Sequence, residues 1–124
     1  MRGRRRGAHL RRPLPFAREI DRLGTDVKTG KMKVEDLQGS TFTITSLGAL
    51  GGLVTTPIIN QPEVAIVGVK KIETRPVWRN GTWEPRQMCN LSSSFDHRVV
   101  DGAEGARFLN TVVELLENPA QLLG

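Results

Sequence analysis

The organisation of this 124-residue chain is decided by residues 92–102, which read Ser-Ser-Ser-Phe-Asp-His-Arg-Val-Val-Asp-Gly. A β-prone stretch ends here and an amphipathic helical pattern begins directly afterwards, so His97 and Asp101 lie in the turn between a strand and a helix. Imidazole takes up and releases a proton near neutral pH. Asp101 has the position of a cap for a helix that begins at Gly102, or of an anchor for the turn. On spacing alone, His-x3-Asp-Gly is a weak pattern, and an ordinary loop histidine beside a helix cap is the favoured interpretation.

The segments on either side predict α/β or α+β layers around one sheet. Downstream, apolar residues at spacings of three and four predict an amphipathic helix that ends at Asn118-Pro119. Upstream, Pro13 and Pro15 are expected to prevent any earlier helix. The predicted elements are a helix from Phe16 to about Gly30, a turn of helix at 34–37, a strand at 41–45 with Phe42 and Ile44 facing inward, a glycine-rich loop at 46–52, a buried strand at 63–72, a hairpin across Asn80-Gly81 and a strand at 87–95.

Several single residues receive structural interpretations. Trp78 and Trp83 flank the hairpin turn and are expected to pack across it. Cys89 is the only cysteine, which excludes an internal disulfide and a multi-cysteine metal site, and we expect it to be a small core residue. The three serines at 92–94 end a strand and are expected to face water. No metal-ligand spacing or phosphate-binding loop is present.

The basic character of the chain comes from its N-terminal region. Residues 1–18 contain seven arginines and no acid, whereas residues 19–124 contain eleven Lys and Arg against thirteen Asp and Glu. Three interpretations remain open for this stretch: a solvated leader, a nucleic-acid-binding arm, and a mitochondrial transit peptide. No Phe, Trp or Tyr interleaves the arginines at positions 2–12, so a nucleic-acid arm has no platform there for base stacking, and the stretch lacks the serine typical of a transit peptide. No apolar run is long enough to predict a membrane span.

The segment Phe95–Ala103 closely resembles the active-site motif of the dihydrolipoamide acyltransferases of 2-oxo acid dehydrogenase complexes, which is His-x3-Asp-Gly. Other similar strings follow the order of that family: residues 39–48, Gly51-Gly52, 57–59, 62–66 and 116–120. The resemblance covers about residues 16–124. The sequences of residues 91–95 and 51–57 favour the branched-chain type found in bacteria.

The resemblance implies a chloramphenicol-acetyltransferase-like α/β fold, a two-layer sandwich of a mixed sheet with flanking helices. Residues 16–124 then form the C-terminal part of the catalytic domain, and residues 1–15 form a basic, disordered leader. Members of the family extend further on the N-terminal side, where they carry lipoyl and subunit-binding domains and an arginine that pairs with the motif aspartate. We therefore expect the chain to be incomplete.

The resemblance also implies a role for each matching residue. His97 is the general base that removes a proton from the thiol of coenzyme A or of dihydrolipoamide. Thr45 supplies the hydroxyl that stabilises the oxyanion of the tetrahedral intermediate. Asp101 keeps the histidine loop in shape through an ion pair. Contacts to coenzyme A are expected at Ser46, Ser94 and Gly102. The substrates are coenzyme A and the lipoyl group, and no metal is expected.

The implied assembly is a homotrimer-based core in which His97 and Thr45 of one site come from different chains. Its partners are lipoyl domains, the 2-oxo acid dehydrogenase and the dihydrolipoamide dehydrogenase, in the bacterial cytoplasm or alternatively the mitochondrial matrix. Three competing hypotheses are an inactive fragment that associates with intact subunits, a chloramphenicol-acetyltransferase-like enzyme and a basic nucleic-acid-binding protein. The strings at 44–48 and 62–65 favour the dehydrogenase-complex branch.

Overall fold

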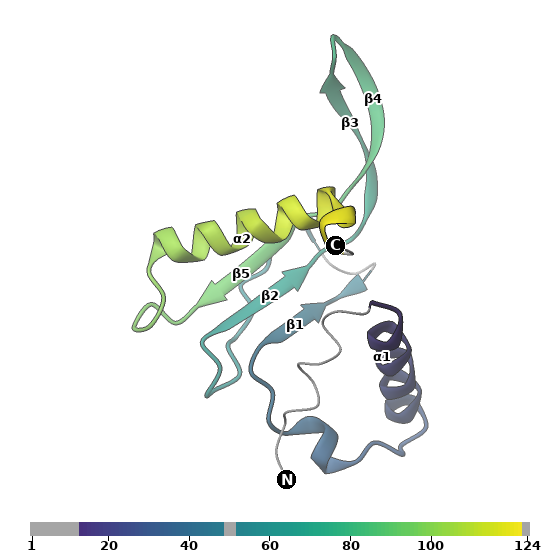
Figure 1. Ribbon diagram of the computed structural model, residues 1–124, viewed down its shortest axis with the longest axis vertical. Coiled ribbons are helices and arrows are strands. Elements are labelled where there is room, and N and C mark those ends of the chain that lie inside the picture. The colour runs from purple at the N-terminus through teal and green to yellow at the C-terminus, as the bar shows by residue number, and fades with distance from the viewer. Residues whose placement is uncertain (1–12, 49–51, 123–124) are drawn as a thin grey trace. The chain divides into compact units, whose positions relative to one another are not determined.

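The fold is described from a computed structural model, in which residues 13–48 and 52–122 are described (Figure 1). Its elements are α1 (Pro13–Lys28), the 3-10 helix η2 (Val34–Leu37), β1 (Thr43–Ser46), β2 (Ala65–Val69), β3 (Glu73–Arg79), β4 (Thr82–Met88), β5 (Leu91–Phe95), α2 (Gly102–Glu117) and the 3-10 helix η4 (Pro119–Leu122). They fall into two compact units, Thr41–Thr111 and a second unit formed by Met1–Ser40 with Val112–Gly124. Each unit is described by itself.

A mixed three-stranded sheet is the centre of the unit Thr41–Thr111. Its strand order is β1-β2-β5, with β2 parallel to β1 and antiparallel to β5 (Figure 1). Parallel neighbours need a crossover connection, and residues 47–64 supply it here. β2 therefore has hydrogen-bonded neighbours on both sides, which agrees with its apolar sequence Ala-Ile-Val-Gly-Val.

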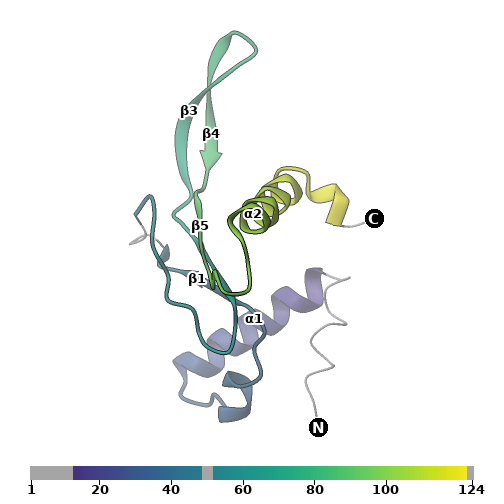
Figure 2. The same ribbon diagram turned by 90° about the vertical axis from the view of Figure 1, so that its left-hand side faces the viewer.

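Strand register divides the sheet into two faces. On the first, which we call the helical face, Phe95 is paired with Ala65, and its ring lies 6.1 Å from that of Phe108 in α2. Phe42 also contacts Phe108, at 5.6 Å between ring centroids. Figure 2 shows the sheet nearly edge-on, with α2 along this face. On the opposite side, which we call the polar face, Thr45 is the register partner of Gly68.

The hydrophobic core is thin and lies on β2. The buried hydrophobic residues of the described chain are Ala65, Ile66 and Val67, each 5% exposed. The inward orientation predicted for Phe42 and Ile44 is only partly right. Phe42 packs on Phe108 of α2 and is 37% exposed, but Ile44 is 69% exposed, because β1 is an edge strand of the described sheet.

The hairpin predicted at Asn80-Gly81 is present. Both turn residues have positive φ, 50° and 81°, as a two-residue turn of this kind requires. Trp78 and Trp83 are register partners, and their rings meet edge to face at 5.3 Å across the hairpin. The hairpin forms a separate two-stranded sheet that extends beyond β2 and β5 (Figure 1), so the prediction of a single sheet was wrong.

The single strand predicted at 87–95 was also wrong. β4 ends at Met88 and β5 begins at Leu91, and the two strands belong to different sheets. Cys89 lies in the break between them and is exposed, not buried. Its thiol lies 3.1 Å from the carbonyl oxygen of Lys70. No glycine or proline lies between Met88 and Leu91, so no strong turn signal marks the break.

In the second unit, α1 begins at Pro13 rather than at Phe16. Proline is tolerated in the first turn of a helix because the N–H groups there have no intrahelical acceptor, so the two prolines start the helix instead of preventing it. The helix ends at Lys28, and Gly30 follows at φ 68°, as predicted. Arg22 pairs with Glu19 at 2.7 Å and with Asp26 at 2.6 Å, and its hydrogen bond to Glu19 raises the pKa of Arg22.

Two predictions lie largely or partly outside the described residues. The disordered leader was predicted for residues 1–15, of which the structure describes only Pro13, Leu14 and Pro15, and these are helical. The glycine-rich loop at 46–52 is described only at its ends, where Gly48 has φ 54°.

The packing of α2 on β5 gives a stability prediction. A Cβ atom added to Gly105 would lie 2.9 Å from Cε2 of Phe95, whereas one added to Gly24 of α1 would meet nothing within 4 Å. Alanine is favoured over glycine in a helix by about 0.8–1.0 kcal/mol, but overpacking costs about 1–3 kcal/mol. We therefore expect Gly105→Ala to destabilise the chain and Gly24→Ala to stabilise it.

Chemical denaturation of both variants checks this prediction. The free energy of unfolding is expected to fall by up to about 2 kcal/mol in Gly105→Ala after the helix-propensity gain is subtracted. A stabilised Gly105→Ala variant would contradict the close contact between α2 and Phe95.

Candidate active site

The His97 turn connects β5 to α2. The backbone N–H of Asp96 donates to the carbonyl of Val64 at 2.8 Å, which extends the pairing of β5 with β2 by one residue. The N–H groups of Val99 and Val100 then both donate to the carbonyl of Asp96, at 2.9 Å, and so close the turn around His97. His97 is exposed, and its imidazole makes no hydrogen bond or ion pair with the described residues. The ring is thus presented to solvent on a turn whose backbone is fixed.

The residues on either side of His97 form a brace. The guanidinium of Arg98 donates to both carboxylate oxygens of Asp96, with Nη2 2.6 Å from Oδ2 and Nε 2.9 Å from Oδ1. The backbone N–H of Arg98 donates to Oδ1 as well, at 3.0 Å. These hydrogen bonds lower the pKa of Asp96 to about 2 and raise the pKa of Arg98. The Asp96–Arg98 pair thus links the two residues that flank His97.

Asp101 caps α2. Its Oδ1 accepts a hydrogen bond from the N–H of Glu104 at 2.7 Å, and the Glu104 carboxylate accepts from the N–H of Asp101 at 3.4 Å. This reciprocal arrangement is a capping box, which satisfies two of the donors that a helix start leaves without partners. The first intrahelical bond runs from Gly105 to the carbonyl of Asp101, at 3.0 Å. The cap fixes where the helix begins relative to His97, four residues earlier.

Thr45 lies on the polar face of the sheet and is half-buried. Its hydroxyl has no hydrogen-bond partner within residues 13–48 and 52–122, whereas the hydroxyl of Thr43, two residues earlier on the same face, donates to Glu63 at 2.6 Å. The Thr45 hydroxyl is therefore available to an acceptor from outside the described chain.

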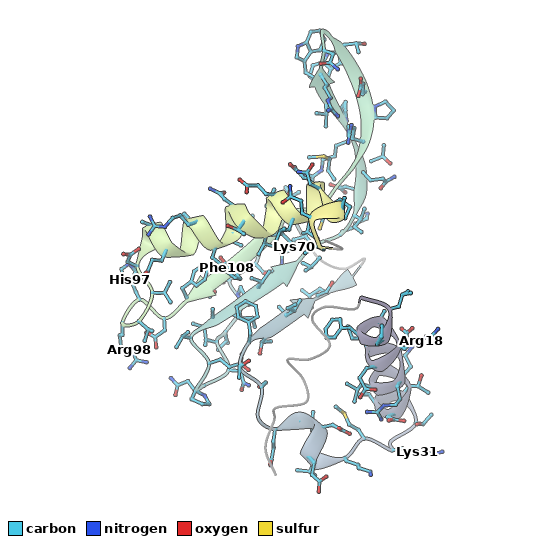
Figure 3. All side chains as sticks on the ribbon, viewed as in Figure 1. Arg18, Lys31, Lys70, His97, Arg98 and Phe108 are labelled. Carbon is cyan, nitrogen blue, oxygen red and sulfur yellow. The ribbon has the colours of Figure 1, made fainter. Side chains whose placement is uncertain are left out.

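The structure does not bring Thr45 and His97 together. Thr45 is the register partner of Gly68, and Gly68 is the partner of Ser92, three residues before Phe95. With a rise of about 3.3 Å per residue and a strand spacing of about 4.8 Å, the Cα atoms of Thr45 and Phe95 are about 14 Å apart. His97 lies two residues further on. Figure 3 shows His97 at the opposite end of the sheet from Lys70, which directly follows β2.

The three residues predicted to contact coenzyme A are dispersed. Ser46 is exposed at the end of β1, and its hydroxyl accepts from the N–H of Gly48 at 3.2 Å. Ser94 is half-buried on the polar face opposite Ile66, and Gly102 is the exposed first residue of α2. Gly102 does not have positive φ, so its conformation is open to other residues.

Sequence reasoning missed a polar cluster on the polar face. Lys70 is only 5% exposed, and its ammonium donates to the hydroxyl of Thr55. Ser92, which we expected to face water, is 8% exposed and accepts from the N–H of Thr55 at 3.3 Å. One signal was available, namely a lysine two residues after a glycine within a buried strand, which places both on the same face.

The described residues contain neither a candidate metal-ion cluster nor a helix that could span a membrane. No group of three or more His, Cys, Asp or Glu side chains within them is arranged to hold a metal ion. None of the helices they form has both the length and the apolar character needed to cross a bilayer.

The sequence matches the family model for the 2-oxoacid dehydrogenases acyltransferase catalytic domain over residues 6–124. The chain belongs to this family. It is 57% identical over 106 residues to the lipoamide acyltransferase component of the branched-chain alpha-keto acid dehydrogenase complex of Pseudomonas putida, a match that covers 86% of this chain and 25% of that relative. The acyltransferase chain thus spans about a quarter of the length of the curated relative that it matches.

Solved structures of the family agree with the fold. The cubic core of the pyruvate dehydrogenase multienzyme complex matches with a TM-score of 0.82 and 43% identity, over 90% of this chain and 46% of that chain. The Azotobacter vinelandii dihydrolipoamide acetyltransferase, studied for the role of a serine, a histidine and an asparagine in its catalytic mechanism, matches with a TM-score of 0.82 and 42% identity, with the same coverage. The predicted acyltransferase fold and the preference for the branched-chain type are confirmed.

The brace beside His97 gives a prediction about pH. Arg98 holds the pKa of Asp96 near 2, below its ordinary value of 3.8. Because the folded-state pKa is lowered, the ionised carboxylate stabilises the turn above about pH 4, and this stabilisation is lost as the pH falls through about 2. In Arg98→Gln we expect the pKa of Asp96 to return toward 3.8.

A carboxyl 13C NMR titration of Asp96 measures this change. Arg107→Gln, which removes an exposed arginine of α2 that has no contact with Asp96 in the described chain, is the matched control and should leave the pKa of Asp96 unchanged. A wild-type Asp96 that titrates near 3.8 would contradict the brace.

Proposed function

We propose that this chain carries the histidine-containing part of an acyltransferase site that moves a branched-chain acyl group between S-acyl-dihydrolipoamide and coenzyme A. Membership of the family and 57% identity to the Pseudomonas putida branched-chain relative support the reaction class and the acyl group. The proposed assembly is the trimer-based core of a 2-oxo acid dehydrogenase complex. Its partners are lipoyl domains, the 2-oxo acid dehydrogenase and the dihydrolipoamide dehydrogenase.

The sequence separations between Thr45, His97 and Asp101 carry the proposal. The serine and the histidine named for the Azotobacter vinelandii enzyme are separated by as many residues as Thr45 and His97, and its asparagine follows the histidine by as many residues as Asp101 follows His97. Threonine keeps the hydroxyl of serine, and aspartate keeps the side-chain oxygen that asparagine uses as a helix cap. Both substitutions therefore preserve the hydrogen-bonding group that the proposed roles need.

In the proposed mechanism, an imidazole nitrogen of His97 takes the proton from the thiol of coenzyme A. The thiolate attacks the carbonyl carbon of the S-acyl-dihydrolipoamide and forms a tetrahedral oxyanion, to which the Thr45 hydroxyl donates a hydrogen bond. The intermediate collapses with cleavage of the bond to the dihydrolipoamide sulfur, and the His97 imidazolium returns the proton to that sulfur. Asp101 and the Asp96–Arg98 brace hold the turn, while Ser46, Ser94 and Gly102 are the proposed contacts to coenzyme A.

The distance between Thr45 and His97 requires two copies of the chain for one site. At about 14 Å or more within one chain, the two side chains cannot act on the same carbonyl, so His97 of one copy is proposed to meet Thr45 of another. The thin core and the exposed apolar residues of the sheet and helices support association. An inactive fragment that only associates with intact subunits is the second candidate, and the same observations favour it.

An acyl-transfer assay with dihydrolipoamide and isobutyryl-, acetyl- or succinyl-coenzyme A tests the function. We expect the highest turnover with isobutyryl-coenzyme A. His97→Ala is expected to reduce kcat by about 10²–10⁴-fold, the usual contribution of a general base. His9→Ala, which removes the only other histidine of the chain, is the matched control and should leave kcat unchanged. Wild-type protein without acyl transfer would support the inactive fragment instead.

Mixing two inactive variants tests whether the site is shared. In trimers assembled at random from equal amounts of His97→Ala and Thr45→Ala chains, about a quarter of the interfaces combine an intact His97 with an intact Thr45. Activity should therefore recover to about a quarter of the wild-type value after the two variants are unfolded and refolded together. If the mixture stays as inactive as the separate variants, the two residues do not complement each other between chains.

A further inference from the structure

We propose that Lys70 is a positioning residue of the acyl-transfer site, which holds residues 53–55 against the polar face beside Thr45 and supplies positive charge where the oxyanion forms. The inference rests on the proposed function, because it takes Thr45 as the donor to that oxyanion. Lys70 belongs to neither the histidine motif nor the proposed contacts to coenzyme A.

Lys70 is buried although its side chain carries a charge. The residue is 5% exposed, and its ammonium donates to the Thr55 hydroxyl. No carboxylate in the described part of the chain forms a salt bridge with it. Burying a cation without a counter-ion is costly. A negative charge that appears nearby during a reaction would offset that cost, and a tetrahedral oxyanion is such a charge.

The position of the ammonium relative to Thr45 follows from Gly68. A Cβ atom on Gly68 would lie 3.2 Å from Oγ1 of Thr55 and 3.5 Å from Nζ of Lys70. Thr45 is the register partner of Gly68 on the adjacent strand, so its side chain points to the same side of the sheet. With about 4.8 Å between strands, Nζ lies within about 9 Å of the Cβ atom of Thr45. Glycine at 68 leaves the space that the ammonium and the hydroxyl occupy.

Three hydrogen bonds attach residues 53–55 to this part of the sheet. Lys70 donates to the Thr55 hydroxyl, the Thr55 N–H donates to the Ser92 hydroxyl at 3.3 Å, and Nδ2 of Asn90 donates to the carbonyl of Leu53 at 3.0 Å. The attached residues belong to the connection that follows β1 and Thr45 in the chain. Lys70 thus restrains this connection and places a charge that water screens only weakly, because the residue is buried.

The comparison of Lys70→Met with Lys71→Met tests the inference. Methionine keeps most of the length of lysine and removes the charge, and Lys71 is the exposed neighbour with the same charge. In the acyl-transfer assay on the whole chain, we expect Lys70→Met to lower kcat at least about tenfold, with KM for coenzyme A nearly unchanged. Lys71→Met should match the wild type, and Lys70→Arg should recover part of the loss because the charge is restored.

Two further measurements separate a positioning role from general damage. Thermal unfolding checks that Lys70→Met folds. Hydrogen exchange of the Thr55 N–H is expected to be at least about tenfold faster in Lys70→Met than in Lys71→Met, because the restraint on residues 53–55 is lost.

The outcomes are distinct for the two proposals. Active wild-type protein with equal kcat in Lys70→Met and Lys71→Met overturns the inference and leaves the proposed function standing. Wild-type protein without acyl transfer overturns the proposed function, and exchange of the Thr55 N–H then decides only whether Lys70 restrains residues 53–55. Equal exchange rates in Lys70→Met and Lys71→Met would contradict this restraint, and faster exchange in Lys70→Met would support it.

Discussion

The structure depends on the double pairing of β2. This strand is parallel to β1 and antiparallel to β5, and it contains the buried apolar residues Ala65, Ile66 and Val67. If the pairing of β1 or β5 with β2 slipped by one residue, every side chain of the slipped strand would move to the other face of the sheet, because side chains alternate along a strand. The register therefore decides at once that Phe95 meets α2 and that Thr45 lies on the opposite side.

The two ends of the sheet consequently have different chemistry. At one end, β5 runs into a short turn that carries His97 and is fixed by backbone hydrogen bonds, by the Asp96–Arg98 pair and by the Asp101 cap. At the other end, Thr45 and the buried Lys70 lie on the polar face. The proposed catalytic site combines residues from both ends of the sheet, and for this reason it is proposed to form between two copies of the chain.

Much of this arrangement could be predicted from the sequence, because it rests on local signals. Asn80-Gly81 specifies a two-residue turn, and the periodicity after Gly102 specifies α2. The errors occurred where tertiary context overrides such signals. No glycine or proline marks the change of sheet at Cys89, and the burial of Lys70 depends on a segment fifteen residues away. The roles of His97 and Thr45 came from family resemblance, since spacing alone allowed an ordinary loop histidine.

The thin core has a consequence for how the stability of this protein is measured. Large apolar side chains on α1, β1 and α2, such as Ile20, Ile44 and Leu116, remain more than half exposed in the single chain. Association that covers them adds free energy to folding by mass action, so folding and assembly become one equilibrium. The midpoint of thermal unfolding then rises with protein concentration, and dilution alone shifts the equilibrium toward unfolded chains.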